Sequence, residues 1–260
     1  MNDKEHFRSA YADGRVLTSK ENIHARYSSK PIDLHGIVVA SCCASTDLSV
    51  LDIGCGTGQF LEYLSSRGHR GSLVGIDLAP PDIPDTAGKR YVAGDAEALP
   101  FEDESFETVT CLHTLSHIRD LDAAMAEARR VLRPGGIYAA TANSLTSYPT
   151  VDRYRRRVHQ LLGRGEATFT TTYLNAENLA PTLSRYWHTT ELHTYDGELR
   201  IPTTEFVEYF AANIPTWDRE PTASQREEIL HWVLGWALLD QQDDHIIEPK
   251  RVALVLCTAQ

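Results

Sequence analysis

Val50-Leu51-Asp52-Ile53-Gly54-Cys55-Gly56-Thr57-Gly58 is the stretch of this 260-residue chain that decides its fold. An apolar, β-branched run leads into three glycines at alternate positions, and Leu61 and Leu64 follow at helical spacing. This order predicts a strand, a tight turn and a helix. Glycine lacks a Cβ, so such a turn accepts positive φ angles and lets a ligand approach the backbone. The N-terminus of the helix would then offer free N–H groups to an electron-rich ligand.

The residues downstream continue to alternate between strand and helix patterns. Leu121 opens an apolar face at helical spacing, and Arg133-Pro134-Gly135-Gly136 ends that predicted helix. Strands are expected at Ser49–Ile53, Ser72–Leu78, Arg90–Ala93, Phe106–Leu112, Ile137–Ala142, His188–His193 and Arg251–Cys257. Strands and helices in this alternation are typical of a parallel sheet with crossover helices.

Several segments of the chain resemble the motifs of class I S-adenosylmethionine-dependent methyltransferases. Asp52–Gly58 resembles their first motif, D-x-G-x-G-x-G, whereas NAD and FAD enzymes usually have G-x-G-x-x-G. Gly75-Ile76-Asp77 resembles the end of the family's second strand, and Gly94-Asp95-Ala96-Glu97 the loop after the third. The resemblance covers roughly residues 49–142 and includes Leu99-Pro100-Phe101, Ser105–Val109, His117–Asp120 and Val131–Gly136.

The resemblance implies an enzyme with S-adenosyl-L-methionine as its cofactor and no metal. In the family, the acidic residue at the position of Asp77 binds both ribose hydroxyls, and the one at Asp95 takes the adenine amino group. The cofactor-binding residues implied here are Asp52, Gly54, Cys55, Gly56, Gly58, Asp77, Leu78, Asp95, Ala96 and Leu112. The fold implied is α/β, a seven-stranded, mostly parallel Rossmann-like sheet with helices on both faces and a helical, aromatic-rich cap. The implied reaction is methyl transfer to an oxygen, nitrogen or carbon nucleophile on a small molecule, such as an intermediate of secondary metabolism.

Two ring-bearing residues are candidates for catalysis. His113 follows the fourth strand, at a place that the family fills variably and that faces the transferring methyl. Its ordinary pKa lies near neutrality, which suits a general base; alternatively, it lines the cofactor pocket or bonds the backbone. Asn22–Ser28 resembles a lid helix, in which Tyr27 would cover the site or simply pack beside Ile23.

The flanks of the core differ from it in composition. Residues 1–45 are expected to form N-terminal lid helices, and residues 46–144 the core cofactor-binding part. Residues 145–174 and 202–248 are rich in aromatics and are predicted to be cap insertions, while 175–201 and 249–260 return to the core as a helix and strands. The candidate substrate residues of the first insertion are Tyr148, Arg155 and His159. Arg155 lies in a basic run, Arg153–Arg157, for which the alternative is a solvated helix face.

Composition limits the partners and the compartment. The net charge of −11 argues against nucleic acid as a partner. The alternatives kept open are an rRNA or tRNA methyltransferase and a non-catalytic cofactor-binding partner of another enzyme. The N-terminus lacks the apolar segment of a secretory signal, and the five cysteines form no CxxC pair. These features predict a cytoplasmic monomer or homodimer with a small-molecule acceptor and no membrane partner.

Overall fold

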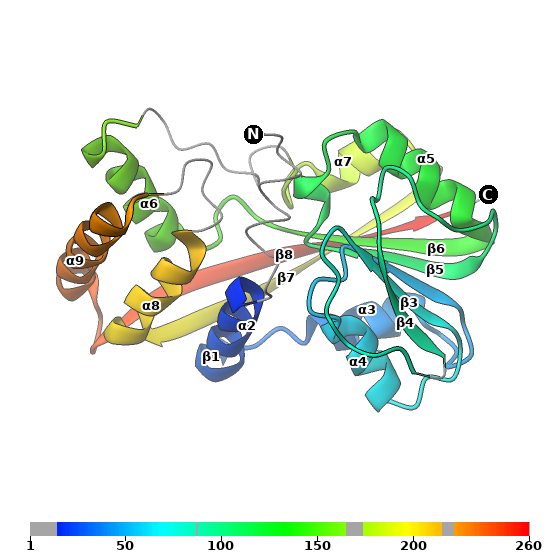
Figure 1. The fold of residues 1–260 in the computed structure, drawn as a ribbon, viewed down its shortest axis with the longest axis horizontal. Helices are drawn as coiled ribbons and strands as arrows, with labels where there is room; N and C mark the ends of the chain where they lie inside the picture. Colours follow the sequence, from blue (N-terminus) through cyan, green and yellow to red (C-terminus); the bar gives the residue numbers. More distant parts are fainter. Residues whose placement is uncertain (1–14, 87, 165–173, 215–220, 260) are drawn as a thin grey trace. The chain divides into compact units, whose positions relative to one another are not determined.

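The chain forms two compact units in the computed structural model, which describes residues 15–86, 88–164, 174–214 and 221–259 (Figure 1). Unit 1 comprises residues 1–32, 146–172 and 195–251, and unit 2 comprises residues 33–145, 173–194 and 252–260. Parts of the predicted lid (1–14) and cap (165–173 and 215–220) lie outside the described residues. Each unit has its own hydrophobic core.

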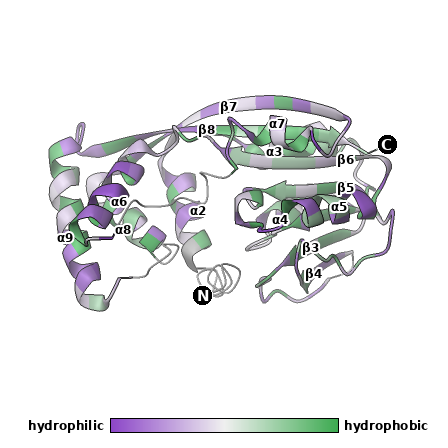
Figure 2. Cartoon of the chain, turned by 90° about the horizontal axis from the view of Figure 1, so that it is seen from above, coloured by the Kyte–Doolittle hydropathy of each residue, from purple (hydrophilic) through white to green (hydrophobic). Residues whose placement is uncertain are grey.

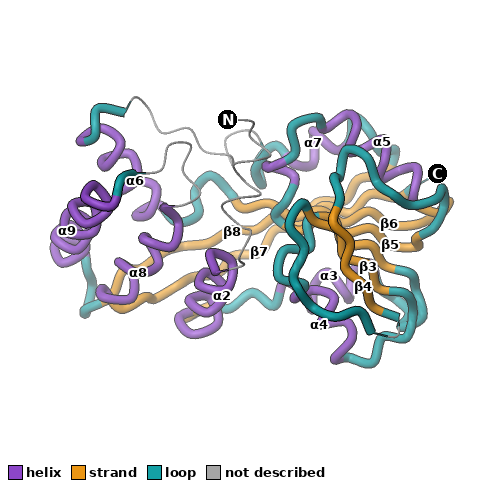
Figure 3. Tube along the Cα trace, in the orientation of Figure 1, coloured by secondary structure: helices purple, strands orange, loops and turns teal. Residues whose placement is uncertain are grey.

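Unit 2 is a mainly parallel sheet covered by helices. Its strands are β2 (Val50–Ile53), β3 (Leu73–Asp77), β4 (Lys89–Ala93), β5 (Phe106–Leu112) and β6 (Leu132–Asn143), with parts of β7 (Thr189–Pro202) and β8 (His245–Thr258). Its helices are α3 (Leu34–Cys42), α4 (Gln59–Ser66), α5 (Leu121–Val131), α7 (Leu179–Leu183) and the 3₁₀ turn η1 (Leu115–His117). Strands β2 to β6 pair in parallel, and β8 joins β6 in antiparallel. Figures 1 and 3 show α5 and α7 on one face of this sheet and α3 and α4 on the other.

Burial explains the central position of β2 and the orientation of α5. All four residues of β2 are buried between β3 and β5, as expected of a strand covered on both faces. Helix α5 buries Ala124, Met125, Ala128 and Val131 along one face. Figure 2 shows apolar colours along the central strands and polar residues on the helices. This packing leaves the ends of the strands as the place where ligands can approach.

Unit 1 is a helical layer built around a second apolar cluster. Its elements are α2 (Arg15–Tyr27), β1 (Ser28–Lys30), α6 (Pro149–Leu161), α8 (Thr203–Asn213) and α9 (Ala223–Asp240), with parts of β7 and β8. Tyr154, Phe206 and Phe210 pack together in its core. A capping box formed by Thr222 and Gln225 begins α9.

The predicted fold class is confirmed, but the strands differ in number and length. The described residues form an eight-stranded sheet in the order β1-β7-β8-β6-β5-β2-β3-β4, where seven strands were predicted. The additional strand is β1, a polar three-residue segment that pairs with β7 and has no periodic pattern of its own. Strand β6 begins at Leu132 rather than Ile137, and β7 and β8 extend well beyond their predicted apolar runs. Within the described ranges, no helix has the length and apolar composition needed to span a bilayer.

The helix expected to open at Asn175 begins four residues later. The side-chain oxygen of Asn175 accepts hydrogen bonds from the N–H groups of Glu177 and Asn178, at 3.1 Å each. It therefore stabilises a turn, and α7 starts at Leu179 after Asn178 as its N-cap. Asn175 thus caps the backbone N–H groups of a turn rather than of the helix itself.

Candidate functional site

The sequence-predicted cofactor residues gather at one edge of unit 2. Strands β5, β2, β3 and β4 are parallel neighbours, so their carboxyl ends lie along the same edge of the sheet. Asp52 and Asp77 lie at the ends of β2 and β3, while Asp95 and His113 follow β4 and β5. In open α/β sheets this is the edge where ligands bind.

The glycine turn between β2 and α4 has the conformation that its sequence predicts. Gly54 and Gly58 have φ angles of 71° and 80°. A Cβ at Gly54 would lie 2.2 Å from the side chain of Thr114, so the site has no room for a larger residue. The N–H of Gly54 donates to the carbonyl of Ile76 at 2.7 Å, which ties the turn to β3. Gly58 begins α4 and has no side chain to cap its first N–H groups, which leaves them available to a ligand.

Two carboxyl groups lie beside this turn. Asp52 is 3% exposed, and its Oδ1 accepts a hydrogen bond of 2.7 Å from the hydroxyl of Thr110. Burial, together with the charge of Asp77, raises the pKa of Asp52 to about 7. Asp77 is half-buried and accepts hydrogen bonds of 3.0 Å from the N–H groups of Gly56 and Ala79. Asp77 therefore holds the turn and also carries negative charge at the edge.

The loop after β4 is held against the end of β3. The N–H of Gly94 donates to the carbonyl of Asp77 at 2.9 Å. The Asp95 carboxylate accepts from the N–H of Glu97 at 3.0 Å, so it forms a local turn. Ala96 and Leu78 are half-buried beside these groups in the chain. The loop thus supplies a third carboxylate next to the strand that ends at Asp77.

His113 has an unusual backbone conformation. Its φ angle is 56°, in the left-handed region that few non-glycine residues adopt. Its N–H donates to Thr141, at 3.2 Å to the carbonyl and 3.0 Å to the hydroxyl, directly after Leu112 at the end of β5. Backbone strain of this kind costs about 1–3 kcal/mol and concentrates at functional sites. The hydroxyl of the next residue, Thr114, donates to the carbonyl of Gly54 at 3.2 Å.

The remaining candidates lie in unit 1. Tyr27 ends α2 and packs, half-buried, against the core of that unit. Tyr148 precedes α6 with φ of 57°, and its N–H donates to the carbonyl of Pro249 at 3.0 Å. Arg155 is half-buried and His159 is 6% exposed, both on α6. The contact of these four residues with the cofactor edge stays a prediction.

Sequence reasoning missed a basic cluster in unit 1 centred on His24, which comprises Lys20, His24 and Lys250. The His24 ring meets Tyr148 edge-on, with centroids 5.8 Å apart. Burial, then Lys250 and Lys20, lower the pKa of His24 to about 3, so this imidazole is neutral at pH 7. Burial lowers the pKa of Lys20 and of Lys250 to about 8. In the sequence, only the spacing of Lys20 and His24, which are one helical turn apart, could have indicated this basic cluster.

Strand β8 contributes a buried carboxyl group two residues before Lys250. Glu248 is fully buried and accepts hydrogen bonds from the N–H groups of Thr150 and Val151, at 3.2 and 2.9 Å. Burial raises the pKa of Glu248 to about 7. Because its oxygens are directed to the first turn of α6, Glu248 acts as a cap for that helix.

The edge of unit 2 fits the chemistry of S-adenosylmethionine. That cofactor carries a sulfonium and an ammonium cation, a ribose diol and an adenine. Asp52 and Asp77 provide negative charge, the glycine turn leaves space against the backbone, and α4 offers uncapped N–H groups. The residues present therefore match the donors, acceptors and charges of the cofactor.

Comparison with known proteins identifies the same segment. Residues 51–140 match the family described as Methyltransferase domain. The chain is 47% identical to a demethylmenaquinone methyltransferase of Roseiflexus castenholzii over 95 residues, which are 34% of this chain and 40% of the relative. It is 30% identical to the malonyl-[acyl-carrier protein] O-methyltransferase of Pseudescherichia vulneris over 181 residues, 68% of this chain and 67% of the relative.

The solved structures agree on the fold. Phosphoethanolamine N-methyltransferase 2 of Haemonchus contortus, in complex with S-adenosyl-L-methionine, superposes with a TM-score of 0.60 at 18% identity, covering 100% of this chain and 60% of that one. Matches to the first two curated relatives span 40% and 52% of their lengths. The chain thus spans about half the length of these two relatives.

Proposed function

Because this chain belongs to the class I S-adenosylmethionine-dependent methyltransferase family, we propose that it transfers the cofactor's methyl group to a nucleophile on a small molecule. The observation that carries this proposal is the acidic edge of unit 2. There Asp52 and Asp77 flank a glycine turn that no larger side chain could replace. When bound, the cofactor supplies an electrophilic methyl group on a good leaving group, so the protein mainly has to position and desolvate the nucleophile.

In this proposal the chain's own residues divide the work. Asp77 binds the ribose diol, Asp95 the adenine amino group, and the uncapped N–H groups of α4 the methionyl part. His113, which follows β5 with a strained backbone, accepts a proton from the nucleophile. Tyr27 excludes water from the lid. Tyr148, Arg155 and His159 contact the acceptor.

We further propose that the acceptor carries an anionic group and an oxygen nucleophile. Lys20 and Lys250 both lie near a neutral His24, and an anion would offset the cost of two half-buried ammonium groups. The side chain of Lys250 makes no hydrogen bond or ion pair with any residue that the structure describes. The name of the relative with the broader match, an O-methyltransferase, supports oxygen as the nucleophile.

The proposal is tested in two steps. Calorimetry with S-adenosylmethionine is expected to give a one-to-one complex, and its absence would overturn the assignment of the family's activity to this chain. Transfer of tritiated methyl is then compared between 10-hydroxydecanoate and 1-decanol, which differ only in the carboxylate. Preference for the acid supports the anionic acceptor, and mass spectrometry distinguishes an ether from an ester product. Transfer to RNA alone would favour the alternative of a nucleic-acid methyltransferase.

A further inference from the structure

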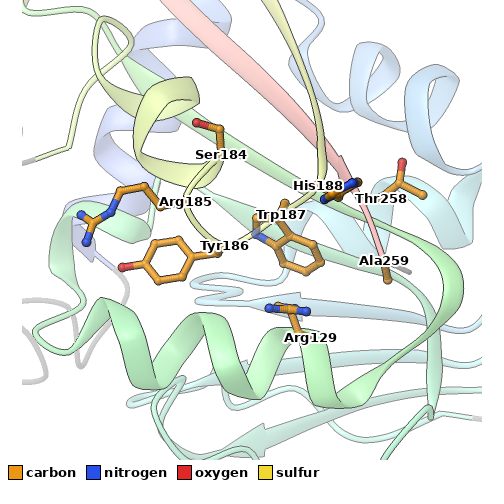
Figure 4. A pocket seen from close by; sticks show the side chains of 8 residues that line it. All are labelled: Arg129, Ser184, Arg185, Tyr186, Trp187, His188, Thr258 and Ala259. Atoms are coloured by element: carbon orange, nitrogen blue, oxygen red, sulfur yellow. The ribbon is translucent and has the colours of Figure 1, made fainter.

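A second polar pocket lies in unit 2, away from the residues assigned above. It has a volume of about 240 Å³ and is lined by Arg129, Ser184, Arg185, Tyr186, Trp187, His188, Thr258 and Ala259. These come from the last turn of α5, the segment between α7 and β7, and the end of β8. We call it the Trp187 pocket (Figure 4).

The Trp187 pocket lies at the opposite edge of the sheet from the glycine turn. Thr258 pairs with Ile137 near the start of β6, and Ala259 exchanges backbone hydrogen bonds with Gly135 and Gly136. The amino ends of the parallel strands are therefore next to this pocket, whereas Asp52 and Asp77 lie at their carboxyl ends. A ligand bound here would not share the cofactor's site.

One residue that lines the pocket has a buried hydrogen-bond donor with no acceptor among the described residues. The Trp187 indole is 4% exposed and stacks on Tyr138, with ring centroids 5.1 Å apart and an angle of 12°. Its Nε1–H has no hydrogen-bond partner among the described residues. Buried indole N–H groups usually find a partner, so we expect an acceptor from outside the described residues.

The lining around that indole consists of donors. Figure 4 shows Arg129 on one side of Trp187 and His188 and Thr258 on the other. The side chains of Arg129 and His188 make no hydrogen bond or ion pair within the part of the chain that the structure describes. No carboxylate is among the eight lining residues. Asp122, on the same helix as Arg129, already accepts a hydrogen bond of 2.5 Å from Tyr186.

Not every lining residue faces the indole. In Figure 4 the guanidinium of Arg185 and the ring of Tyr186 point away from Trp187. Arg185 instead lies over the Tyr186 ring, 5.6 Å from its centroid. The groups that a ligand in the pocket can reach are therefore the guanidinium of Arg129, the His188 ring and the hydroxyl of Thr258, which all belong to exposed residues.

We propose that the Trp187 pocket binds a phosphate group, either free inorganic phosphate or the phosphoryl group of a small metabolite. A guanidinium presents parallel N–H groups that match two oxygens of a phosphate, and hydroxyl and imidazole donors can take the remaining ones. The cavity is large enough for a phosphate with a short substituent. Arg129 also lies in the last turn of α5, where a cation stabilises the helix dipole without any ligand. An experiment can separate phosphate binding from stabilisation of the helix dipole, because only the first role depends on phosphate.

The test uses the full chain labelled with ¹⁵N and follows the indole N–H resonance of Trp187, assigned with Trp187→Phe. Sodium phosphate is titrated against sodium chloride at constant ionic strength. The proposal predicts a saturable shift of this resonance with phosphate and none with chloride. Arg129→Gln should weaken phosphate binding by about tenfold or more, because it removes a charge-assisted pair of hydrogen bonds. The matched control is Arg67→Gln, which removes an exposed arginine of unit 2 outside the pocket and should leave binding unchanged.

Adenosine monophosphate distinguishes the two sources of the phosphate. Tighter binding of the nucleotide than of inorganic phosphate supports a metabolite's phosphoryl group, and equal binding supports the free ion. A wild-type protein without a saturable shift, or an Arg129→Gln variant that binds phosphate as the wild type does, would overturn the proposal. If Arg129→Gln lowers the unfolding temperature by the same amount with and without phosphate, Arg129 only stabilises the helix dipole, and this result too would overturn the proposal.

Discussion

The two units of the chain collect charges of opposite sign. Unit 2 brings Asp52 and Asp77 to the ends of two neighbouring strands, next to a turn that exposes backbone N–H groups. Unit 1 gathers Lys20 and Lys250 around a neutral His24. A cationic cofactor suits the first arrangement and an anionic acceptor suits the second. The charge of each unit therefore indicates the charge of the ligand that it binds. Each of the following experiments tests this relation for one of the two units.

The largest effect is expected from Gly54→Ala. The added Cβ would meet Thr114 at 2.2 Å in a backbone with φ of 71°, so the turn must move. We expect S-adenosylmethionine binding to be lost in calorimetry, while circular dichroism reports whether the fold persists. The matched control is Gly68→Ala, which has φ of 80° and nothing within 4 Å of the added Cβ. Loss of binding in both variants would mean that backbone strain, rather than the shape of the turn, is responsible.

His113→Ala tests whether unit 2 also supplies the base. If His113 takes the proton of a hydroxyl acceptor, kcat should fall by about 10²–10⁴-fold and cofactor affinity should stay nearly unchanged. The ascending limb of the pH–rate profile near neutrality should disappear as well. Steady-state kinetics measure kcat and its pH dependence with 10-hydroxydecanoate or 1-decanol, whichever is the better acceptor. A rise in KM with unchanged kcat would instead assign His113 to orienting the acceptor.

Asp77→Asn should weaken cofactor binding by about 10- to 100-fold, because a charge-assisted acceptor pair for the ribose diol is lost. The side-chain oxygen that remains can still accept one of the two backbone N–H groups, from Gly56 or Ala79. Asp85→Asn serves as the control, since Asp85 is exposed and likewise accepts a backbone N–H, that of Tyr91. Calorimetric affinity equal to wild type in Asp77→Asn would remove this residue from the ribose site.

The sequence predicted unit 2 far better than unit 1, and the reason is locality. The glycine turn, the strand ends and the α5 helix depend on residues that are close in the chain, so their spacing carries the information. The clash of a Cβ at Gly54 with Thr114 and the strained backbone of His113 depend on how β5 leaves the sheet, and no local pattern encodes that. In unit 1, His24, Tyr148 and Lys250 meet only through folding. Strand β1 has three polar residues and exists because β7 provides a partner.

Asp52→Asn should affect cofactor binding and stability in opposite directions. Burial raises the pKa of Asp52 to about 7, far above the ordinary value of about 3.9. The folded state thus favours the protonated acid, and its stability declines as pH rises from about 4 to about 7. At pH 8 the variant should unfold at a higher temperature than wild type, and at pH 3 at about the same temperature.

The same titration should appear in cofactor affinity. Only the ionised Asp52 attracts a cation, so wild-type affinity for S-adenosylmethionine should rise about tenfold between pH 6 and pH 8. Asp52→Asn should bind weakly at both pH values, without that rise. Calorimetry at the two pH values measures both proteins. An equal rise in wild type and variant would attribute the pH dependence to another group.

The smallest effect is expected in unit 1, from Lys250→Gln. Lys250 is half-buried, and water screens part of its attraction for an anion, so the loss should be nearer to that of an exposed pair than of a buried one. We expect the KM for 10-hydroxydecanoate to rise about fivefold, corresponding to about 1 kcal/mol, with kcat unchanged. The KM for 1-decanol should stay the same, because that acceptor has no carboxylate.

The ratio of the two KM values separates recognition of the anion from general damage to unit 1. A misfolded unit would raise both values together, whereas loss of a carboxylate contact raises only one. Lys30→Gln is the matched control, because Lys30 is an exposed lysine of the same unit, outside the basic cluster. It should change neither KM. If Lys250→Gln also leaves both KM values unchanged, Lys250 does not contact the acceptor. The basic cluster of unit 1 would then give no information about the charge of the acceptor. The acidic edge would still account for the cofactor, because none of its residues takes part in this test.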